Sequence, residues 1–362
     1  MQPPHSTLVG PVKGGEGNRQ ERLGHGSGPP ARTLRSRESL TDLLLLLQEE
    51  IGAEWPETPD RLGKICRYAL RPPGKLLRPL LYLMSAMAVG AEPGTVLTAA
   101  LGGEYGHVAS LIHDDVVDGD DMRRGRRSVP HRYGVGEAIV SGDGLIFASF
   151  LGLSRCLDSG VPAERIVHAL RLAATTGLDM CRGQLLEAEV GGDLSCGIDT
   201  YLRMVTLKTA AALKCACQSG AILGGGSPQQ IEALARFGEH IGVAFQIEDD
   251  LLPYTSDTFT AGKQANSDVR NRRPTLPILL AYRTASESDR QLIAEVLSGR
   301  TSPVTAHERI REVLLRTGAI GEARGIACEH VRHGCEALDA LPRTPHRDAL
   351  THLATSVINR DR

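Results

Sequence analysis

Apolar positions along this chain of 362 residues recur at helical spacing, in segments that Pro and Gly separate. SLTDLLLLLQEEI starts at Ser39, a capping residue, and Pro56 closes this first helical segment. In residues 71–90, RPPGKLLRPLLYLMSAMAVG, a Pro/Gly loop leads into a buried helix whose first turn tolerates Pro79. Residues 95–118 lack proline, which predicts one long helix ending in acidic residues.

Alternating strand patterns of useful length and fixed-period repeats are missing from the sequence. Aromatic residues make up only 4% of the chain, and abundant Ala and Leu favour helix packing over β-sandwiches and barrels. The fold class is therefore predicted as all-α, with residues 39–362 forming a single helical domain. Further helices are predicted at about 135–157, 163–190, 199–223, 228–252 and 275–283, with others after 304.

The first 38 residues carry scattered Arg, Gly and Pro with almost no apolar run, so residues 1–38 are predicted to be a disordered tail. Leu43 to Leu47 is too short for a signal-peptide core or a membrane span, and no membrane anchor is expected. The formal net charge of −2 argues against a nucleic-acid partner. Eight cysteines without C-x-x-C or zinc spacing indicate reduced core residues in a cytoplasmic protein.

Residues 111–130, LIHDDVVDGDDMRRGRRSVP, crowd acidic and basic side chains together. On a helix, Asp114 and Asp118 lie one turn apart on the same face, next to Asp115. Such carboxylates repel unless a cation lies between them, and all-oxygen ligands suit Mg²⁺. A solvated helix end is the alternative interpretation, but neighbouring aliphatic residues place part of this face in the core, where a carboxylate needs a partner.

A second acidic pair, Asp249 and Asp250, follows the apolar segment GVAFQIEDD. Two facing Asp-rich helices can hold one diphosphate through several Mg²⁺ ions. Direct phosphate contacts are expected from the cationic side chains Arg123, Arg124, Lys208 and Lys263.

From about residue 40 to 285 the chain resembles the trans-isoprenyl diphosphate synthase family, also called polyprenyl synthetases. The resemblance rests on motifs in a fixed order. These are PGKLLRP (73–79), HVASLIHDDVVDGDDMRRG (107–125), GDGL (142–145), Gly183–Gln184, Lys208–Thr209, FQIEDD, and GKQANSD followed by TLP (262–277).

The resemblance implies an all-α isoprenoid-synthase-type bundle of roughly ten or more helices around a central cavity, usually a homodimer. It implies a prenyltransferase that joins isopentenyl diphosphate to an allylic diphosphate by ionisation, condensation and elimination, with three Mg²⁺ ions. The implied metal ligands are Asp114, Asp115, Asp118 and Asp249. The implied allylic diphosphate contacts are Arg123, Lys208 and Lys263. The implied isopentenyl diphosphate pocket is Lys75, Arg78, His107 and Arg124. Thr209 and Gln246 would line the reacting centre.

The sequence departs from the family pattern in the second acidic motif, which usually reads DDxxD and here reads DDLLP. Pro253 cannot bind metal, and it predicts that the helix ends or kinks at Leu252. The resemblance places most of the metal-binding role on Asp249, so the reaction class is retained. Asp257, in the following loop, is a candidate to reach back toward the lost position. A smaller departure is Leu76, where the family often has Arg.

Product length in this family depends on the bulk of side chains upstream of the first motif. Ser110, Ala109 and Gly106 are small, which predicts a product of C20 (geranylgeranyl) or longer. If the tunnel for the growing chain has a deeper floor, the candidate residues for it are the aromatic residues Tyr105, Phe147 and Phe150.

Two alternatives remain open at the level of the sequence. A class I terpene cyclase on the same fold ionises an allylic diphosphate without condensing it, but it needs no second diphosphate pocket. A non-catalytic subunit of a heteromeric synthase is favoured only by Pro253, and the intact first motif opposes it.

Overall fold

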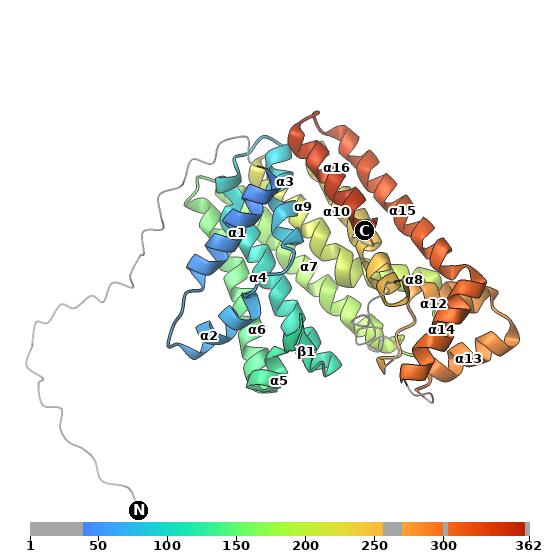
Figure 1. Ribbon diagram of the computed structural model, residues 1–362. Coiled ribbons are helices and arrows are strands. Elements are labelled where there is room, and N and C mark those ends of the chain that lie inside the picture. The colour runs from blue at the N-terminus through green and yellow to red at the C-terminus, as the bar shows by residue number, and fades with distance from the viewer. Residues whose placement is uncertain (1–38, 256–269, 300–302, 359–362) are drawn as a thin grey trace, which may run out of the picture. The chain divides into compact units, whose positions relative to one another are not determined.

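A computed structural model describes residues 39–255, 270–299 and 303–358 (Figure 1). The chain divides into a short unit, Met1–Thr33, and a larger one, Leu34–Arg362, and every described residue belongs to the larger unit. The predicted tail, residues 1–38, lies outside the described residues. Apart from one two-stranded hairpin, the regular elements of the described part are helices, which confirms the all-α prediction.

The first two helices begin at the capping residues Ser39 and Asp60. Ser39 and Asp42 form a capping box, in which the Ser39 amide donates to the Asp42 carboxylate at 3.0 Å and the Asp42 amide donates to the Ser39 hydroxyl at 3.2 Å. Pro79 lies in the first turn of its helix, as predicted. The elements are α1 (Leu40–Glu54), α2 (Arg61–Leu70), α3 (Leu77–Ala88) and α4 (Pro93–Asp118).

After α4 the chain turns back in a short antiparallel hairpin that the sequence pattern did not predict. Strand β1 (Met122–Arg123) pairs with β2 (Arg126–Arg127). Both residues of the connecting turn have positive φ, 51° at Arg124 and 77° at Gly125, as a two-residue hairpin loop requires. The hairpin turns the chain so that Arg123 faces back toward the end of α4. Helices α5 (Val129–Tyr133) and α6 (Val135–Ser154) follow.

The helix predicted at 199–223 is interrupted. The structure has α7 (Ala163–Glu189), α8 (Gly197–Val205), a π-helical segment η2 (Thr206–Ala210) and α9 (Ala211–Gly224). A π turn lodged between helices is uncommon and is often found at functional sites. Lys208 and Thr209, both expected at the active site, lie inside it.

The C-terminal half consists of long helices, among which α13 was not predicted. They are α10 (Pro228–Thr255), α12 (Leu276–Thr284), α13 (Glu287–Leu297), α14 (Pro303–Thr317), α15 (Ala319–Ala337) and α16 (Pro345–Ile358). Helix α10 continues through Pro253 to Thr255, so of the two expectations for Leu252, an end or a kink, the end is wrong. Proline removes one backbone donor only, and the Thr255 hydroxyl donates to the Leu251 carbonyl at 3.1 Å in the same turn.

Helix α4 packs against α3, α6 and α9, while α10 packs between α9 and α15 (Figure 1). Contact between α4 and α6 is close because glycines remove the side chains there. A Cβ at Gly102 would lie 2.7 Å from the Ser149 carbonyl oxygen, and one at Gly152 would lie 2.4 Å from that of Thr98. This packing fixes the helix that carries the first acidic motif.

Candidate active site

The first acidic motif forms the last turn of α4, which Gly119 ends with a φ of 64°. Asp115 points inward and is almost fully buried, and its carboxylate accepts a bond from Arg123 Nε at 2.8 Å. Burial raises the pKa of Asp115, and the Arg123 guanidinium opposes that rise. The hairpin therefore supplies the counter-charge for the middle carboxylate, and Arg123 contacts this motif directly.

The other two carboxylates of the motif face a group of charges from segments distant in the sequence. Arg273 donates to Asp118 at 2.8 Å and lies 3.3 Å from Glu187 of α7. Lys208 Nζ donates to the same Glu187 carboxylate at 2.6 Å. Burial raises the pKa of Asp114, the positive charge of Lys208 lowers it, and the negative charges of Asp118 and Glu187 raise it. These residues therefore form one alternating cluster of charges.

The π segment brings Lys208 to this cluster, and Gly183 makes room for it. A Cβ at Gly183 would lie 2.5 Å from the backbone nitrogen of Lys208, so α7 and η2 meet at backbone distance. Glu187 lies one turn beyond Gly183 on the same face of α7. The glycine thus allows the lysine to reach the glutamate.

The second acidic pair sits near the end of α10, and two uncharged side chains donate to Asp250. Thr209 Oγ1 donates to Gln246 Oε1 at 2.8 Å, and Gln246 Nε2 donates to Asp250 Oδ1 at 2.8 Å. Tyr201 of α8 donates its hydroxyl to Asp250 Oδ2 at 2.7 Å. Both oxygens of the buried Asp250 are thus engaged, while Asp249 is placed near Arg78, whose pKa it influences.

Three of the four residues expected in the second diphosphate pocket lie together. A Cβ at Gly74 would lie 2.5 Å from an Arg124 guanidinium nitrogen, so the PGKLLRP loop contacts the hairpin. Burial lowers the pKa of His107 well below its ordinary value, and the charges of Arg78 and Arg124 lower it further. The imidazole is therefore neutral near pH 7 and can donate one hydrogen bond. Lys75 is exposed in the same loop.

Glu104 lies one turn before His107 on α4 and is only 2% exposed. Burial raises its pKa to about 7, and Arg78 and Arg124 act to lower it. The buried Arg78 Nε has no hydrogen-bond partner among the described residues. A buried cation with an unsatisfied donor fits an anionic ligand.

The donor set of both motifs fits Mg²⁺ in its chemistry, because every candidate ligand is a carboxylate oxygen. Within the described ranges, no three His, Cys, Asp or Glu side chains converge as a ready-made metal cage. Mg²⁺ needs no such cage, since it usually takes one or two carboxylates and completes its shell with water and substrate phosphates. Arg273 would have to leave Asp118 when that carboxylate binds a metal.

Sequence reasoning missed three residues of this site: Glu187, Arg273 and Tyr201. A signal existed for Arg273, in the NRRP segment directly before TLP. The sequence also contained a signal for Glu187, because this residue follows Gly183 by one helical turn. Lys263 and Asp257 lie outside the described residues.

His113, for which the sequence suggested no role, joins α4 to α6. A Cβ at Gly142 would lie 2.3 Å from its Nε2, which lies 3.6 Å from Asp143. The GDGL motif therefore packs on the histidine of the first motif.

The residues considered for product length separate into two groups. Tyr105 is buried, donates to Glu54 at 2.6 Å and packs edge-on against Trp55. Phe147 is 72% exposed, so it cannot form a floor inside a single chain. Ala109 is buried and Ser110 turns its hydroxyl back to the His107 carbonyl, so neither presents bulk.

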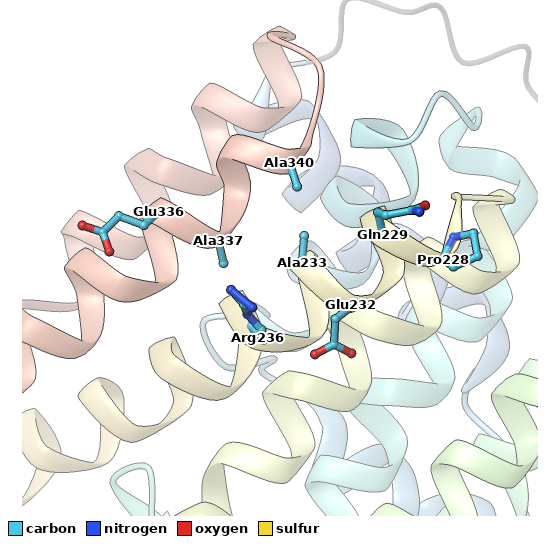
Figure 2. Close-up of a pocket in the computed structure, with 8 residues that line it drawn as sticks. All are labelled: Pro228, Gln229, Glu232, Ala233, Arg236, Glu336, Ala337 and Ala340. Atoms are coloured by element: carbon cyan, nitrogen blue, oxygen red, sulfur yellow. The ribbon is translucent and has the colours of Figure 1, made fainter.

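A separate hollow of about 460 Å³ lies between the start of α10 and the end of α15 (Figure 2). Arg236 and Glu232 of α10 and Glu336 of α15 line it. Twenty-one residues of helix separate Pro228 at this hollow from Asp249, or about 30 Å at 1.5 Å per residue. The hollow is therefore distinct from the acidic motifs.

Comparison with known proteins matches residues 59–314 to the family model for polyprenyl synthetase. A short chain isoprenyl diphosphate synthase from Methanothermobacter thermautotrophicus is 36% identical over 90% of this chain and 94% of its own length. A geranylfarnesyl diphosphate synthase from Natronomonas pharaonis is 34% identical over 87% and 95%. The crystal structure of geranylgeranyl pyrophosphate synthetase from Pyrococcus horikoshii superposes with a TM-score of 0.80 at 30% identity, covering 88% of this chain and 96% of that one.

Proposed function

Since the chain belongs to the polyprenyl synthetase family and is a prenyltransferase, we propose that it joins isopentenyl diphosphate to an allylic diphosphate in trans. The observation that carries this proposal is the presence of two cationic positions. Lys208 lies beside the acidic cluster of Asp114 and Asp118, and Arg78, His107 and Arg124 lie together at the PGKLLRP loop. A cyclase acting on one diphosphate has no use for the second position.

Divalent metal ions serve catalysis in this family, and the polyprenyl synthase of Caulobacter crescentus was crystallised with calcium and isoprenyl diphosphate. We propose Mg²⁺ here, three ions per site, held by Asp114, Asp115, Asp118 and Asp249. The bound ions would neutralise the negative charge that develops on the leaving diphosphate. Asp115 and Asp118 would bind metal once Arg123 and Arg273 release them.

The side chains of the chain itself would perform the remaining steps. Lys208 and Arg123, with Lys263, hold the allylic diphosphate and stabilise its departure as the carbon–oxygen bond breaks. Thr209 and the Gln246 amide oxygen face the allylic cation. Arg78, Arg124, Lys75 and the neutral imidazole of His107 hold isopentenyl diphosphate so that its double bond attacks that cation. The departed diphosphate takes the proton, so no side-chain base is needed.

We propose a product of C20 or longer. Support comes from the small residues before Asp114, from the buried position of Tyr105 a further turn away, and from the names of relatives, among them a geranylfarnesyl and two geranylgeranyl diphosphate synthases. Growing chains would run along α4 and stop where bulk first appears.

We also propose a homodimer built on α6 and α7. Exposed apolar side chains cover these helices, including Val140 (64%), Phe147 (72%) and Leu185 (71%). The segment Val135–Leu157 is long and apolar enough to cross a membrane by length and composition alone, with 28% of its window buried. A second copy would cover the same apolar face. A cytoplasmic location is proposed because all eight cysteines are free thiols.

A product assay tests the proposed function. Purified protein is incubated with Mg²⁺, labelled isopentenyl diphosphate and C5, C10, C15 or C20 allylic diphosphates, and the products are resolved by mass. Labelled chains of C20 or longer are expected. A hydrocarbon formed from the allylic substrate alone would instead identify a cyclase, and no turnover with any primer would identify a subunit that needs a partner.

A further inference from the structure

One stripe along helix α4 is partly accessible, although most of the helix is buried. Asp114, Ser110 and Gly103 recur along this stripe at intervals of one or two helical turns, and each of them is partly accessible. The next residues on the same face, Ala100 and Val96, are buried. The stripe therefore starts at the first acidic motif and ends at Gly103, 11 residues or about 16 Å away along the helix axis.

A second stripe of the same kind starts in η2 and continues along α9. Lys208, Ala212 and Cys215 are partly accessible at helical spacing, whereas Ser219, one turn after Cys215, is buried. Burial raises the pKa of Asp114 and the neighbouring charge of Lys208 lowers it, so the two stripes start at the same group of charges. Helices α4 and α9 also pack against each other.

Tyr82 of α3 lies at the far end of both stripes. A Cβ at Gly103 would lie 3.6 Å from Cδ2 and 4.0 Å from Cε2 of the tyrosine, so the ring crosses the end of the first stripe. Burial raises the pKa of Tyr82 well above its ordinary value, the nearby Cys215 raises it further, and Ser219 lowers it. The side chain of Tyr82 therefore contacts α4 and also reaches α9 at the level where the second stripe ends.

The backbone holds Tyr82 at this position. A Cβ at Gly220 would lie 2.3 Å from the Tyr82 carbonyl oxygen and 3.1 Å from the Ser85 side chain, so α3 and α9 meet at backbone distance beside this residue. Every residue of α3 from Pro79 to Ala88 is buried. A ring in such a close-packed region cannot withdraw without moving its neighbours, so Tyr82 forms a fixed end to the stripes.

We propose that Tyr82 sets the product length by closing the far end of the path along which the prenyl chain grows. This inference rests on the proposed function, because it takes the tail of the product to run along the two stripes from a diphosphate held at Asp114 and Lys208. The tail is apolar, and side chains that it would pass before Tyr82, such as those of Ser110 and Ala212, are small. Burial of each added C5 unit favours elongation until the ring blocks the path.

Tyr105, the buried tyrosine of α4 itself, does not lie on this path. Nine residues, or about two and a half helical turns, separate it from Asp114, so the two side chains point to opposite sides of α4. Tyr105 instead faces α1, where it donates to Glu54 at 2.6 Å and packs edge-on against Trp55. The element that limits the product is therefore α3, which lies outside both acidic motifs.

The test compares the lengths of labelled products that the full-length variants form from labelled isopentenyl diphosphate and a C15 allylic diphosphate with Mg²⁺. Tyr82→Leu removes the ring but keeps an apolar side chain. Its product should be longer than the wild-type product by at least one C5 unit, because an apolar cavity accepts an apolar guest. Tyr82→Phe keeps the ring and should keep the wild-type length. Tyr105→Leu, the same change on the opposite side of α4, is the matched control and should also keep that length.

Tyr82→Ala opens more space and should lengthen the product at least as far, while Tyr82→Leu decides the matter if the alanine variant does not fold. A product of wild-type length from Tyr82→Leu overturns the inference. Longer chains from Tyr105→Leu alone also overturn it, because they would place the limiting residue on α4. Wild-type protein that forms no labelled product contradicts the proposed function instead, so the two failures are distinguishable.

Discussion

The two acidic regions stabilise their buried carboxylates in different ways. At the end of α4, arginines and a lysine surround the carboxylates: Arg123 on Asp115, and Arg273 on Asp118. At the end of α10, Asp250 is bound by a tyrosine hydroxyl and a glutamine amide. Charged partners can be exchanged for metal ions, whereas neutral donors fix geometry. We therefore expect metal ions to replace the cationic side chains in the first region. In the second region, the hydrogen bonds fix the orientation of the Asp250 carboxylate.

Removing one carboxylate from each region tests this difference most strongly. Asp249→Asn should lower kcat about 10³-fold and Asp114→Asn about 10²-fold, because both lose transition-state charge stabilisation, but the first motif keeps other carboxylates for the metals whereas Asp249 is the one ligand proposed in the second. Steady-state kinetics at saturating Mg²⁺ measures both. Asp121→Asn, whose side chain is 79% exposed, is the control and should retain activity. A larger loss for Asp114→Asn would reverse the comparison.

Arg273→Gln should destabilise the metal-free protein by about 2 kcal/mol, because it leaves the partly buried Asp118 without the counter-charge of Arg273 and leaves Glu187 with Lys208 alone. Mg²⁺ with inorganic diphosphate should then stabilise the variant more than the wild type. Thermal unfolding with and without ligand measures this. Arg270→Gln serves as control, since its pair with Asp120 is half exposed and contributes little. Equal stabilisation of both proteins would show that Arg273 and the metal do not compete.

Tyr201→Phe removes one neutral donor from the second region. The loss should be about 1–2 kcal/mol in the free energy of unfolding, because a buried carboxylate loses one hydrogen bond. Urea unfolding measures it. Tyr133→Phe is the matched control, since its ring makes the cation–π contacts with Arg61 and Arg132 and is retained. A change smaller than the control's would mean that the Tyr201 hydroxyl does not stabilise Asp250.

The smallest effect concerns the middle of α10, where His240 meets α15. His240 and His330 of α15 approach to 3.0 Å between their Nδ1 atoms, and burial, followed by the His240 charge, lowers the pKa of His330 from 6.5 to about 4. The unfolded chain therefore binds a proton that the folded chain refuses, and stability should decrease as pH falls from 6.5 toward 4. Unfolding midpoints at pH 7.5 and 5 measure this. His330→Asn should reduce the loss of stability between these two pH values. An unchanged loss would show that the pair of His240 and His330 does not cause it.

Much of this molecule was predictable because local chemistry decides it. Capping at Ser39, the proline-free helix ending in Asp118 and the order of motifs all follow from the sequence. The family and the reaction class are confirmed by relatives that cover most of the chain.

The remainder depends on contacts between distant elements. The π segment at Lys208 packs against Gly183 of α7 at backbone distance. The pairing of Arg273 with Asp118 joins residues that are 155 positions apart. Helix α10 runs past Pro253, where His307 and Arg311 of α14 contact the carbonyls of Pro253 and Tyr254, and no local rule on proline contains these contacts. Individual roles of the site residues stay predictions.

The π segment also has a consequence for sequence change. Its wider turn contains one residue more than an α-helix would, so α9 begins one residue out of phase with α8. Deleting a single residue between Thr206 and Ala210 would merge the two into one regular helix, with every hydrogen bond of the backbone intact. The bundle would survive, but Lys208 and Thr209 would rotate away from Glu187 and Gln246. Deletion of one codon would then give a stable protein without enzyme activity.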